Sequence, residues 1–432
     1  MASNEHLGAG ISLRPIRLLF LLGCLTFWGI RVYYWSITVE EPFSDMADYV
    51  RIAHGILTAF DFGHGAFWQS YKPPTMPLLL AVDFRFFGLD NMIAWRVTQT
   101  AFLFVALLLL CRELVQSTRT PWYAVTLIWI VALSKSSIFW SYKPATESMS
   151  EAFLYLAAAA TSWAVRRRSA VAFGLVGFVY VVTLLLRPQF LPVLPLLLVG
   201  LAVWAWFDGR SWRAKSRFAI CFLLAAAAVW APWLVRGMML YGNPVPVSTQ
   251  GPYSFLWELG AVTIREPDGS AEKRDVHQLL AEAPQRFDND YQAMVHANRF
   301  VAQWLRDKGR SYPTLIISRA KRSLVEKEIF LTHVSRSELL PPLFNRFLID
   351  KHATLLIAGV LGLLVMATMV PMGFLPVAAI SIAQWLMGAA FMGEARLAEP
   401  SLPLFLFGNV VWVVLLFRLA RHLTAMSMEP PP

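Results

Sequence analysis

TVEEPFSDMADYVRIAHGILTAFDFGHGAFWQSYKPPTMP, residues 38–77, directly follows the first long apolar run of the chain. Acids, histidines and a lysine gather in it: Glu40, Glu41, Asp45, Asp48, His54, Asp61, His64 and Lys72. A chain in contact with lipid rarely carries so many ionisable groups at a membrane edge unless they bind charge or take part in chemistry. The segment therefore predicts a functional site beside the first apolar run.

The composition indicates a polytopic membrane protein. Of the 432 residues, 57% are hydrophobic and only 15% are charged, which is too apolar for a soluble domain. A net charge of +10 can indicate nucleic-acid binding, but here the arginines form short clusters between apolar runs, as cytoplasmic loops do. We therefore expect no nucleic-acid partner.

Apolar runs of spanning length predict about ten transmembrane helices. The first lacks a small-residue cleavage site and is too long for a signal peptide, so we expect an uncleaved anchor. Residues 78–89 cover only about 18 Å against a hydrocarbon core of about 30 Å, so we expect a half-embedded or interfacial helix. The basic clusters then fall on the side of the N-terminus. The expected spans are 16–37, 91–111, 121–139, 148–165, 169–186, 189–206, 218–235, 352–370, 372–391 and 401–417.

This topology divides the chain into three parts. Residues 1–235 form an N-terminal transmembrane module with a first outer loop at 38–90, residues 236–350 form a long extracytoplasmic region, and residues 351–432 form C-terminal transmembrane helices and a cytoplasmic tail. Within the long region, 297–330 has helical apolar periodicity with interspersed arginines, which predicts an amphipathic basic helix pair on the outer leaflet or over the site. Acids and cations gathered at one membrane face suit a base-assisted reaction on a lipid-linked phosphate.

Seven pieces of the sequence, in order, resemble the GT-C glycosyltransferases. The resemblance is to the branch that includes the protein O-mannosyltransferases and the lipid A aminoarabinose transferases. The pieces are SDMADY (44–49), YKPPTMPLLL (71–80), FFGLDNMIAWR (86–96), ATESMSEAFLYLA (145–157), LLRPQFL (185–191), APWLVRGMMLYGNPVPVSTQG (231–251) and EARLAEPSLPLF (394–405). They run through nearly the whole chain, and each lies on the predicted outer face.

The resemblance implies an all-α GT-C fold with juxtamembrane helices in the first outer loop. It implies an inverting transfer of a sugar from a polyprenyl-phosphate donor to a hydroxyl of a glycan, lipid or protein on the extracytoplasmic side. Some GT-C enzymes use a divalent ion, but this branch generally does not, so we expect no metal and no cofactor. The compact size favours a bacterial inner membrane.

The resemblance also assigns the acids. Asp45 is the expected general base for the acceptor hydroxyl, with Asp48 as the substitute, and Glu147 is the second acid, which orients the acceptor or a cation. The alternative for Asp45 is that it caps a helix together with Ser44, with Asp48 as a first-turn acid. The alternative for Glu147 is that it caps the span that starts at Ser148.

Four cations are expected at the donor phosphate: Lys72, Arg187, Arg236 and Arg396. Arg187 and Arg236 end spans on the outer side, which the positive-inside rule does not explain but an anionic phosphate does. Lys72 has the alternative of an interfacial lysine, and Arg396 of a pair with Glu394. The side chains expected to contact substrate are Tyr49, His64, Tyr71 and Tyr142.

Two other functional classes remain open. A transporter or lipid flippase would account for ten spans, but it predicts charges near the bilayer midplane and internal repetition, which the sequence does not show. A non-catalytic subunit with the GT-C fold is the second alternative.

Overall fold

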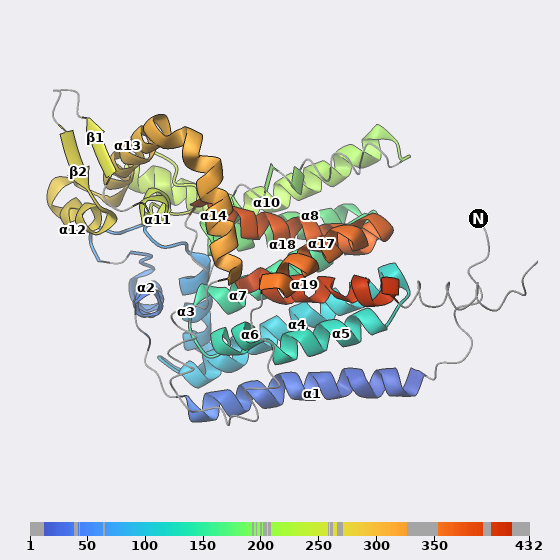
Figure 1. Ribbon diagram of the computed structural model, residues 1–432. Helices are drawn as coiled ribbons and strands as arrows, with labels where there is room; N and C mark the ends of the chain where they lie inside the picture. Colours follow the sequence, from blue (N-terminus) through green and yellow to red (C-terminus); the bar gives the residue numbers. More distant parts are fainter. Residues whose placement is uncertain are drawn as a thin grey trace, which may run out of the picture.

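Long apolar helices form a bundle in the computed structural model (Figure 1). The structure describes residues 13–38, 42, 44–63, 65–191, 194–195, 197–198, 201, 205, 209–257, 259, 262–265, 271–325, 353–391 and 399–416. The bundle helices are α1 (Leu13–Ile37), α4 (Met92–Thr118), α5 (Trp122–Leu133), α6 (Lys135–Trp140), α7 (Thr146–Arg167), α8 (Ala170–Leu186), α10 (Trp212–Tyr241), α17 (Ala353–Met369), α18 (Pro371–Phe391) and α19 (Leu402–Gly408).

The described helices confirm a helical membrane protein. Four are long and apolar enough to cross a bilayer: Arg14–Ile37, Met92–Thr118, Trp212–Tyr241 and Glu399–Leu416. Four shorter apolar helices lie on further predicted spans: Trp122–Leu133, Ala170–Leu186, Thr354–Met369 and Phe374–Ala390. The predicted span at 189–206 begins with the 3-10 turn η2 (Pro188–Phe190) and continues largely outside the described residues.

The prediction of one continuous span at 121–139 is wrong. The chain leaves the helix at Ser134, which has an extended backbone and separates α5 from α6. The hydroxyl of Ser134 accepts a hydrogen bond from Ser137 N at 3.4 Å and so caps α6. Ser134 therefore acts as the N-cap of a new helix. Its hydroxyl gives the Ser137 N–H a partner, which this group would otherwise lack at the interruption.

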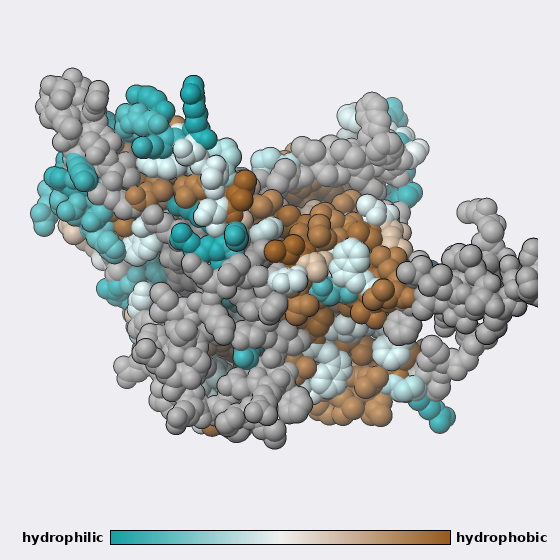
Figure 2. Space-filling view, viewed as in Figure 1, coloured by the Kyte–Doolittle hydropathy of each residue, from teal (hydrophilic) through white to brown (hydrophobic). Residues whose placement is uncertain are grey.

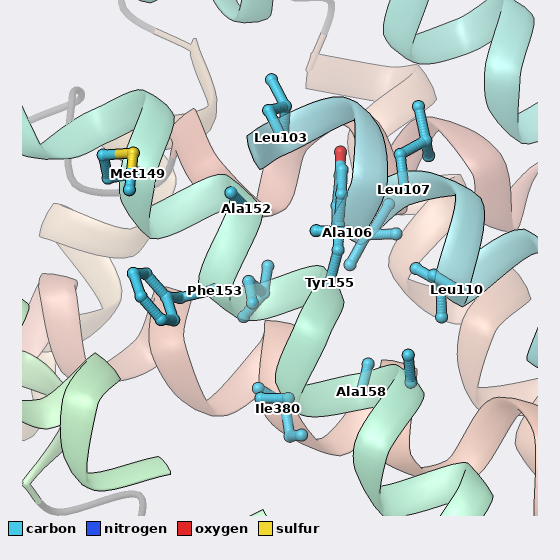
Figure 3. Close-up of a cluster of buried hydrophobic side chains, with 14 of the residues drawn as sticks. Leu103, Ala106, Leu107, Leu110, Met149, Ala152, Phe153, Tyr155, Ala158 and Ile380 are labelled. Atoms are coloured by element: carbon cyan, nitrogen blue, oxygen red, sulfur yellow. The ribbon is translucent and has the colours of Figure 1, made fainter. Parts of the chain in front are cut away.

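Helix α7 lies at the centre of the bundle. Eighteen of its 22 residues are buried, and many of them are alanine or serine, so neighbouring helices can approach closely. Figure 3 shows α7 side chains, from Met149 to Ala158, in one cluster with leucines of α4 and with Ile380 of α18. This packing holds the first turn of α7, with Glu147, at a fixed position relative to α4 and α18.

Glycines allow α17 and α19 to touch backbone to backbone. A side-chain carbon added at Gly359 would meet the carbonyl oxygen of Phe405, and one added at Gly408 would meet the carbonyl oxygen of Gly359. Small residues at such contacts are what permits close helix packing in a bilayer.

Replacing Gly359 by alanine is therefore expected to lower the stability of the folded protein by roughly 1–3 kcal/mol, the usual cost of overpacking. Thermal unfolding in detergent measures the change. Gly29→Ala is the matched control, because a side-chain carbon there would meet nothing within 4 Å and alanine favours a helix over glycine by about 1 kcal/mol. Equal melting temperatures for both variants would contradict the expectation.

The remaining elements gather at one end of the bundle (Figure 1). They are α2 (Asp45–Ala59), α3 (Thr75–Phe87), α11 (Gly251–Leu256), β1 (Val262–Arg265), β2 (Ala271–Arg274), α12 (Val276–Arg286), α13 (Asp290–Lys308), η3 (Gly309–Ser311) and α14 (Tyr312–Val325). Helix α3 is 13 residues long, the short helix predicted at 78–89. The described parts of the first outer loop and of the 236–350 region thus meet at the same end, as their shared predicted side requires.

The outer elements include secondary structure that the sequence did not predict. The strands β1 and β2 form an antiparallel hairpin with Val262 opposite Arg274, which was not predicted. The expected helix pair at 297–330 is present as α13 and α14. Figure 2 shows hydrophilic side chains gathered over the end that carries α12 and α13, and hydrophobic side chains across the bundle. This division is the one a membrane-embedded bundle with an aqueous end requires.

Candidate active site

A cavity of about 440 Å³ opens where the outer elements meet the bundle. Its walls come from the start of α2, the segment between α6 and α7, the turn η2, the segment before α11, and α13. These elements are far apart in the sequence. The cavity therefore exists only because the first outer loop and the long outer region fold against each other.

The cavity wall at α2 carries Asp45. Lys72 Nζ donates to Asp45 Oδ1 at 2.6 Å, and Asp48 Oδ2 lies 3.7 Å from the same nitrogen. The side chain of Asp45 is 33% exposed, whereas that of Lys72 is 3% exposed. Asp45 lines the cavity, whereas Lys72 is not among the described residues that do so. The buried lysine therefore fixes the position of the carboxylate.

The alternative for Asp45 is supported only in part: Ser44 is the N-cap residue of α2, and Asp45 and Asp48 lie in its first turn, but no side chain caps the helix at Ser44. Ser44 has a positive φ of 50° and makes no capping hydrogen bond with its side chain. Asp48 also differs from Asp45, because its Oδ1 pairs with Arg51 at 2.6 Å and it is not among the described residues that line the cavity. The backbone at Ser44 lies in a conformation that non-glycine residues seldom adopt, and such conformations concentrate at functional sites.

A second acid that lines the cavity, Glu147, pairs with Arg187. Arg187 follows α8, and its Nη2 donates to Glu147 Oε1, while its Nε donates to Thr146 Oγ1 at 2.8 Å. Both charged side chains are buried and both line the cavity. The pairing compensates the cost of removing each charge from water. Arg187 Nη1 is buried without a hydrogen-bond partner.

Arg236, which was expected at the donor phosphate, instead contacts the first outer loop. Its Nη1 donates to Ser70 Oγ and its Nη2 to the carbonyl oxygen of Gln69, both at 2.9 Å. It is not among the described residues that line the cavity. Arg236 therefore fixes the backbone just before Lys72.

Asp290 completes this anchor. Its carboxylate is fully buried and accepts from Ser70 N at 2.8 Å, Tyr241 OH at 2.8 Å and Thr249 Oγ1 at 2.9 Å. The hydrogen bonds join the first outer loop to the end of α10 and to the start of α13. Because Lys72 follows Ser70 by two residues, the network also positions the lysine behind Asp45.

Replacing Asp290 by alanine leaves two buried donors, Ser70 N and Thr249 Oγ1, without a partner, whereas Tyr241 OH keeps Ser70 Oγ as an acceptor. We expect a loss of at least about 1–3 kcal/mol of stability, measured as a lower melting temperature in detergent. Asp288→Ala is the matched control, because Asp288 is exposed and its carboxylate accepts a hydrogen bond from Gln292 Nε2 at 3.3 Å. A melting temperature for Asp290→Ala equal to that of the control would show that the network does not stabilise the outer end.

The predicted substrate-binding tyrosines take different positions. Tyr49 lines the cavity. Tyr71 packs against Trp68 and Tyr253, with its ring 5.2 Å from Lys72 Nζ, and burial raises the pKa of its phenol further above neutral pH. Tyr142 packs edge-on against Tyr34, and its carbonyl oxygen accepts from Arg96 Nε at 3.2 Å. The predicted His64 and Arg396, and Glu394 with which Arg396 was paired as an alternative, lie outside the described residues.

Sequence reasoning missed Lys143. This lysine lines the cavity and its Nζ lies 5.3 Å from the Tyr142 ring centroid. The tetrapeptide Ser-Tyr-Lys-Pro occurs twice, at 70–73 and at 141–144. In both copies the lysine is buried beside the ring of the preceding tyrosine. The repeated tetrapeptide is the sequence signal that could have identified Lys143 as a site residue.

A buried arginine supports the cavity wall from within the bundle. Arg31 Nη2 donates to the Val131 carbonyl oxygen at 3.2 Å, near the end of α5, and to Ser137 Oγ at 2.7 Å. Ser137 Oγ in turn donates to Glu151 Oε1 at 3.1 Å. A cation favours the carbonyl end of a helix, so Arg31 stabilises the break between α5 and α6. The segment after α6 is the one that carries Lys143.

Comparison with known proteins shows the fold. No protein-family model and no curated protein sequence matches the chain. Among solved structures, the apo oligosaccharyltransferase of Archaeoglobus fulgidus is 14% identical with a TM-score of 0.54, over 96% of this chain and 52% of that one. The oligosaccharyltransferase AglB from the same organism, in complex with an inhibitory peptide and a dolichol-phosphate, is 12% identical with a TM-score of 0.55, over 98% of this chain and 53% of that one.

A third similar structure is apo ArnT from Cupriavidus metallidurans, at 12% identity and a TM-score of 0.37, over 91% of this chain and 78% of that one. The chain spans about half the length of the oligosaccharyltransferases that it matches. The likeness to the oligosaccharyltransferases confirms the predicted fold class, a helical GT-C membrane fold.

Proposed function

We propose that this GT-C membrane protein is an inverting glycosyltransferase that takes its sugar from a polyprenyl-phosphate donor. The acceptor is a hydroxyl of a glycan, a lipid or a protein, and the reaction takes place at the outer face of a membrane, in a bacterium the inner membrane. One observation carries the proposal: a carboxylate, Asp45, and a buried arginine with an unpartnered N–H, Arg187, line the same cavity.

In the proposed reaction, Asp45 accepts the proton of the acceptor hydroxyl while that oxygen attacks the anomeric carbon of the donor sugar. The bond between this carbon and the phosphate oxygen breaks, and the polyprenyl phosphate leaves with the electron pair. A single displacement inverts the configuration at the anomeric carbon. The energy comes from the donor bond, so the transfer requires no nucleotide.

The cavity supplies the cation for the leaving phosphate. Arg187 Nη1 is a preformed donor in a site largely removed from water, where such a donor stabilises developing negative charge far better than in solution. Lys143 lines the same cavity. Because Lys72 is already held between Asp45 and Asp48, we assign it to the orientation of the base rather than to direct contact with the phosphate.

The likeness to AglB supports a lipid-linked donor. The structure of that protein is a complex with an inhibitory peptide and a dolichol-phosphate, so a protein of this fold binds a lipid phosphate there. The transporter alternative has less support, because the cavity charges lie at one end of the bundle. The buried charges of the bundle interior, Arg31 and Glu151, are joined through Ser137 and support the α5–α6 break.

The proposal is tested with purified protein in detergent or liposomes. Polyprenyl-phosphate sugars are offered with envelope extracts as acceptor, and the release of polyprenyl phosphate is measured together with sugar incorporation. Mass spectrometry of envelope glycans and lipids from a deletion strain identifies the acceptor. If none of the sugars is transferred and the deletion changes no glycan, a non-catalytic role takes the place of this proposal.

A further inference from the structure

The turn after α8 carries two buried hydrogen-bond donors on residues that line the cavity. Arg187 and Gln189 are 6% and 8% exposed, and both line the cavity. Arg187 Nη1 and Gln189 Nε2 are buried without a hydrogen-bond partner. The turn between them is fixed, because Phe190 is fully buried and its carbonyl oxygen accepts from Tyr180 OH at 2.7 Å.

Two buried, unpartnered N–H groups on residues that line one cavity can be satisfied by acceptor atoms of a bound ligand. A buried donor without a partner costs about 1–3 kcal/mol, so native structures retain such groups chiefly where something bound satisfies them. Both atoms are donors and neither can accept, since Arg187 is a guanidinium and the free atom of Gln189 is its amide nitrogen. A ligand that satisfies both donors would therefore bring oxygen acceptors, as a phosphate does.

The charge of the site limits how much negative charge it can hold. Four of the described residues that line the cavity are charged, and they balance: Asp45 and Glu147 against Lys143 and Arg187. Arg187 is moreover already paired with Glu147. In a cavity of low effective dielectric, each further uncompensated charge is costly. A phosphodiester brings one negative charge, whereas a diphosphate brings at least two.

We propose that Gln189 is a specificity-determining residue of the donor site, an inference that rests on the proposed function. Arg187 Nη1 binds one oxygen of a single phosphate, and the neutral amide of Gln189 binds the second oxygen without adding charge. The site therefore selects donors linked through one phosphate over donors linked through a diphosphate. A cation in place of Gln189 would remove this preference.

The experiment compares the binding of polyprenyl phosphate and polyprenyl diphosphate of equal chain length to the full-length protein in detergent. The unaltered protein is expected to prefer the monophosphate. Gln189→Met, which keeps the length of the side chain but removes the donor, should weaken monophosphate binding about 10- to 100-fold. Gln189→Lys should shift the ratio of the two affinities at least about tenfold toward the diphosphate.

Gln303→Lys is the matched control, because Gln303 lies half-buried on α13 with Asp307 as its hydrogen-bond partner and is not among the described residues that line the cavity. Thermal unfolding checks that each variant is folded, and Gln189→Asn, which retracts the amide, replaces any variant that is not. Unchanged monophosphate binding in the variant that lacks the donor, or an unchanged ratio in Gln189→Lys, overturns the inference while the proposed function stands. Competition by inorganic phosphate as strong as that by the lipid also overturns it. If the unaltered protein binds neither lipid, the proposed function itself fails.

Discussion

Replacing Asp45 by asparagine is expected to lower the rate of sugar transfer about 100- to 10,000-fold, the usual contribution of a general base. The protein should stay folded, because Lys72 keeps Asp48 within 3.7 Å and asparagine has nearly the shape of aspartate. Donor binding should change little, since the proposed phosphate contacts come from Arg187 and Gln189 and not from Asp45. Initial rates, donor affinity and melting temperature measured on one preparation separate the three effects.

Asp48→Asn is the control that decides between the two carboxylates. Asp48 pairs with Arg51 and is not among the described residues that line the cavity, so its loss should reduce the rate much less than the loss of Asp45. If Asp48→Asn is the inactive variant and Asp45→Asn is active, Asp48 is the base. If neither substitution changes the rate, the proposed mechanism is wrong.

Replacing Arg187 by methionine is expected to abolish detectable donor binding and to lower stability by about 3–5 kcal/mol. The stability loss arises because Glu147 stays buried without its partner, which is far more costly than removing both charges. The double variant Arg187→Met with Glu147→Gln removes the unpaired charge and should recover most of the melting temperature. It should not recover donor binding or transfer, because the N–H groups that face the phosphate remain absent.

The double variant thus separates a structural role of Arg187 from a binding role. Recovery of both stability and transfer would show that the arginine acts only as the partner of Glu147. A single variant as stable as the unaltered protein would show that the buried pair does not hold this wall. Thermal unfolding and binding of polyprenyl phosphate, measured in the same detergent, give both answers.

The sequence predicted well the parts of the site that topology alone determines. Asp45 and Lys72 belong to one 40-residue segment beside one span, so any correct topology brings them to the same face. Arg187 was found because a cation at an outer helix end contradicts the usual charge bias. These arguments need only the order of spans and loops.

What the sequence did not predict depends on tertiary packing. Arg236 follows the same pattern as Arg187, but α10 continues to Tyr241, beyond the predicted end at residue 235. Arg236 therefore sits within a helix and reaches the backbone of Gln69 rather than the cavity. The contributions of Met294 and Asn298 to the cavity wall require α13 to fold back over the first outer loop, and no local pattern encodes that contact.

The burial of α7 on nearly every side has a consequence for how the chain enters a membrane. This helix is not among the described helices that are apolar enough to span a bilayer, because it carries Glu147, Glu151 and several serines. We expect it to partition poorly into lipid when it leaves the translocation channel alone. Its integration should depend on α4 and α8, so biogenesis of this protein is cooperative. An insertion assay should show α7 excluded as a single segment and integrated when the chain from α4 to α8 is synthesised together.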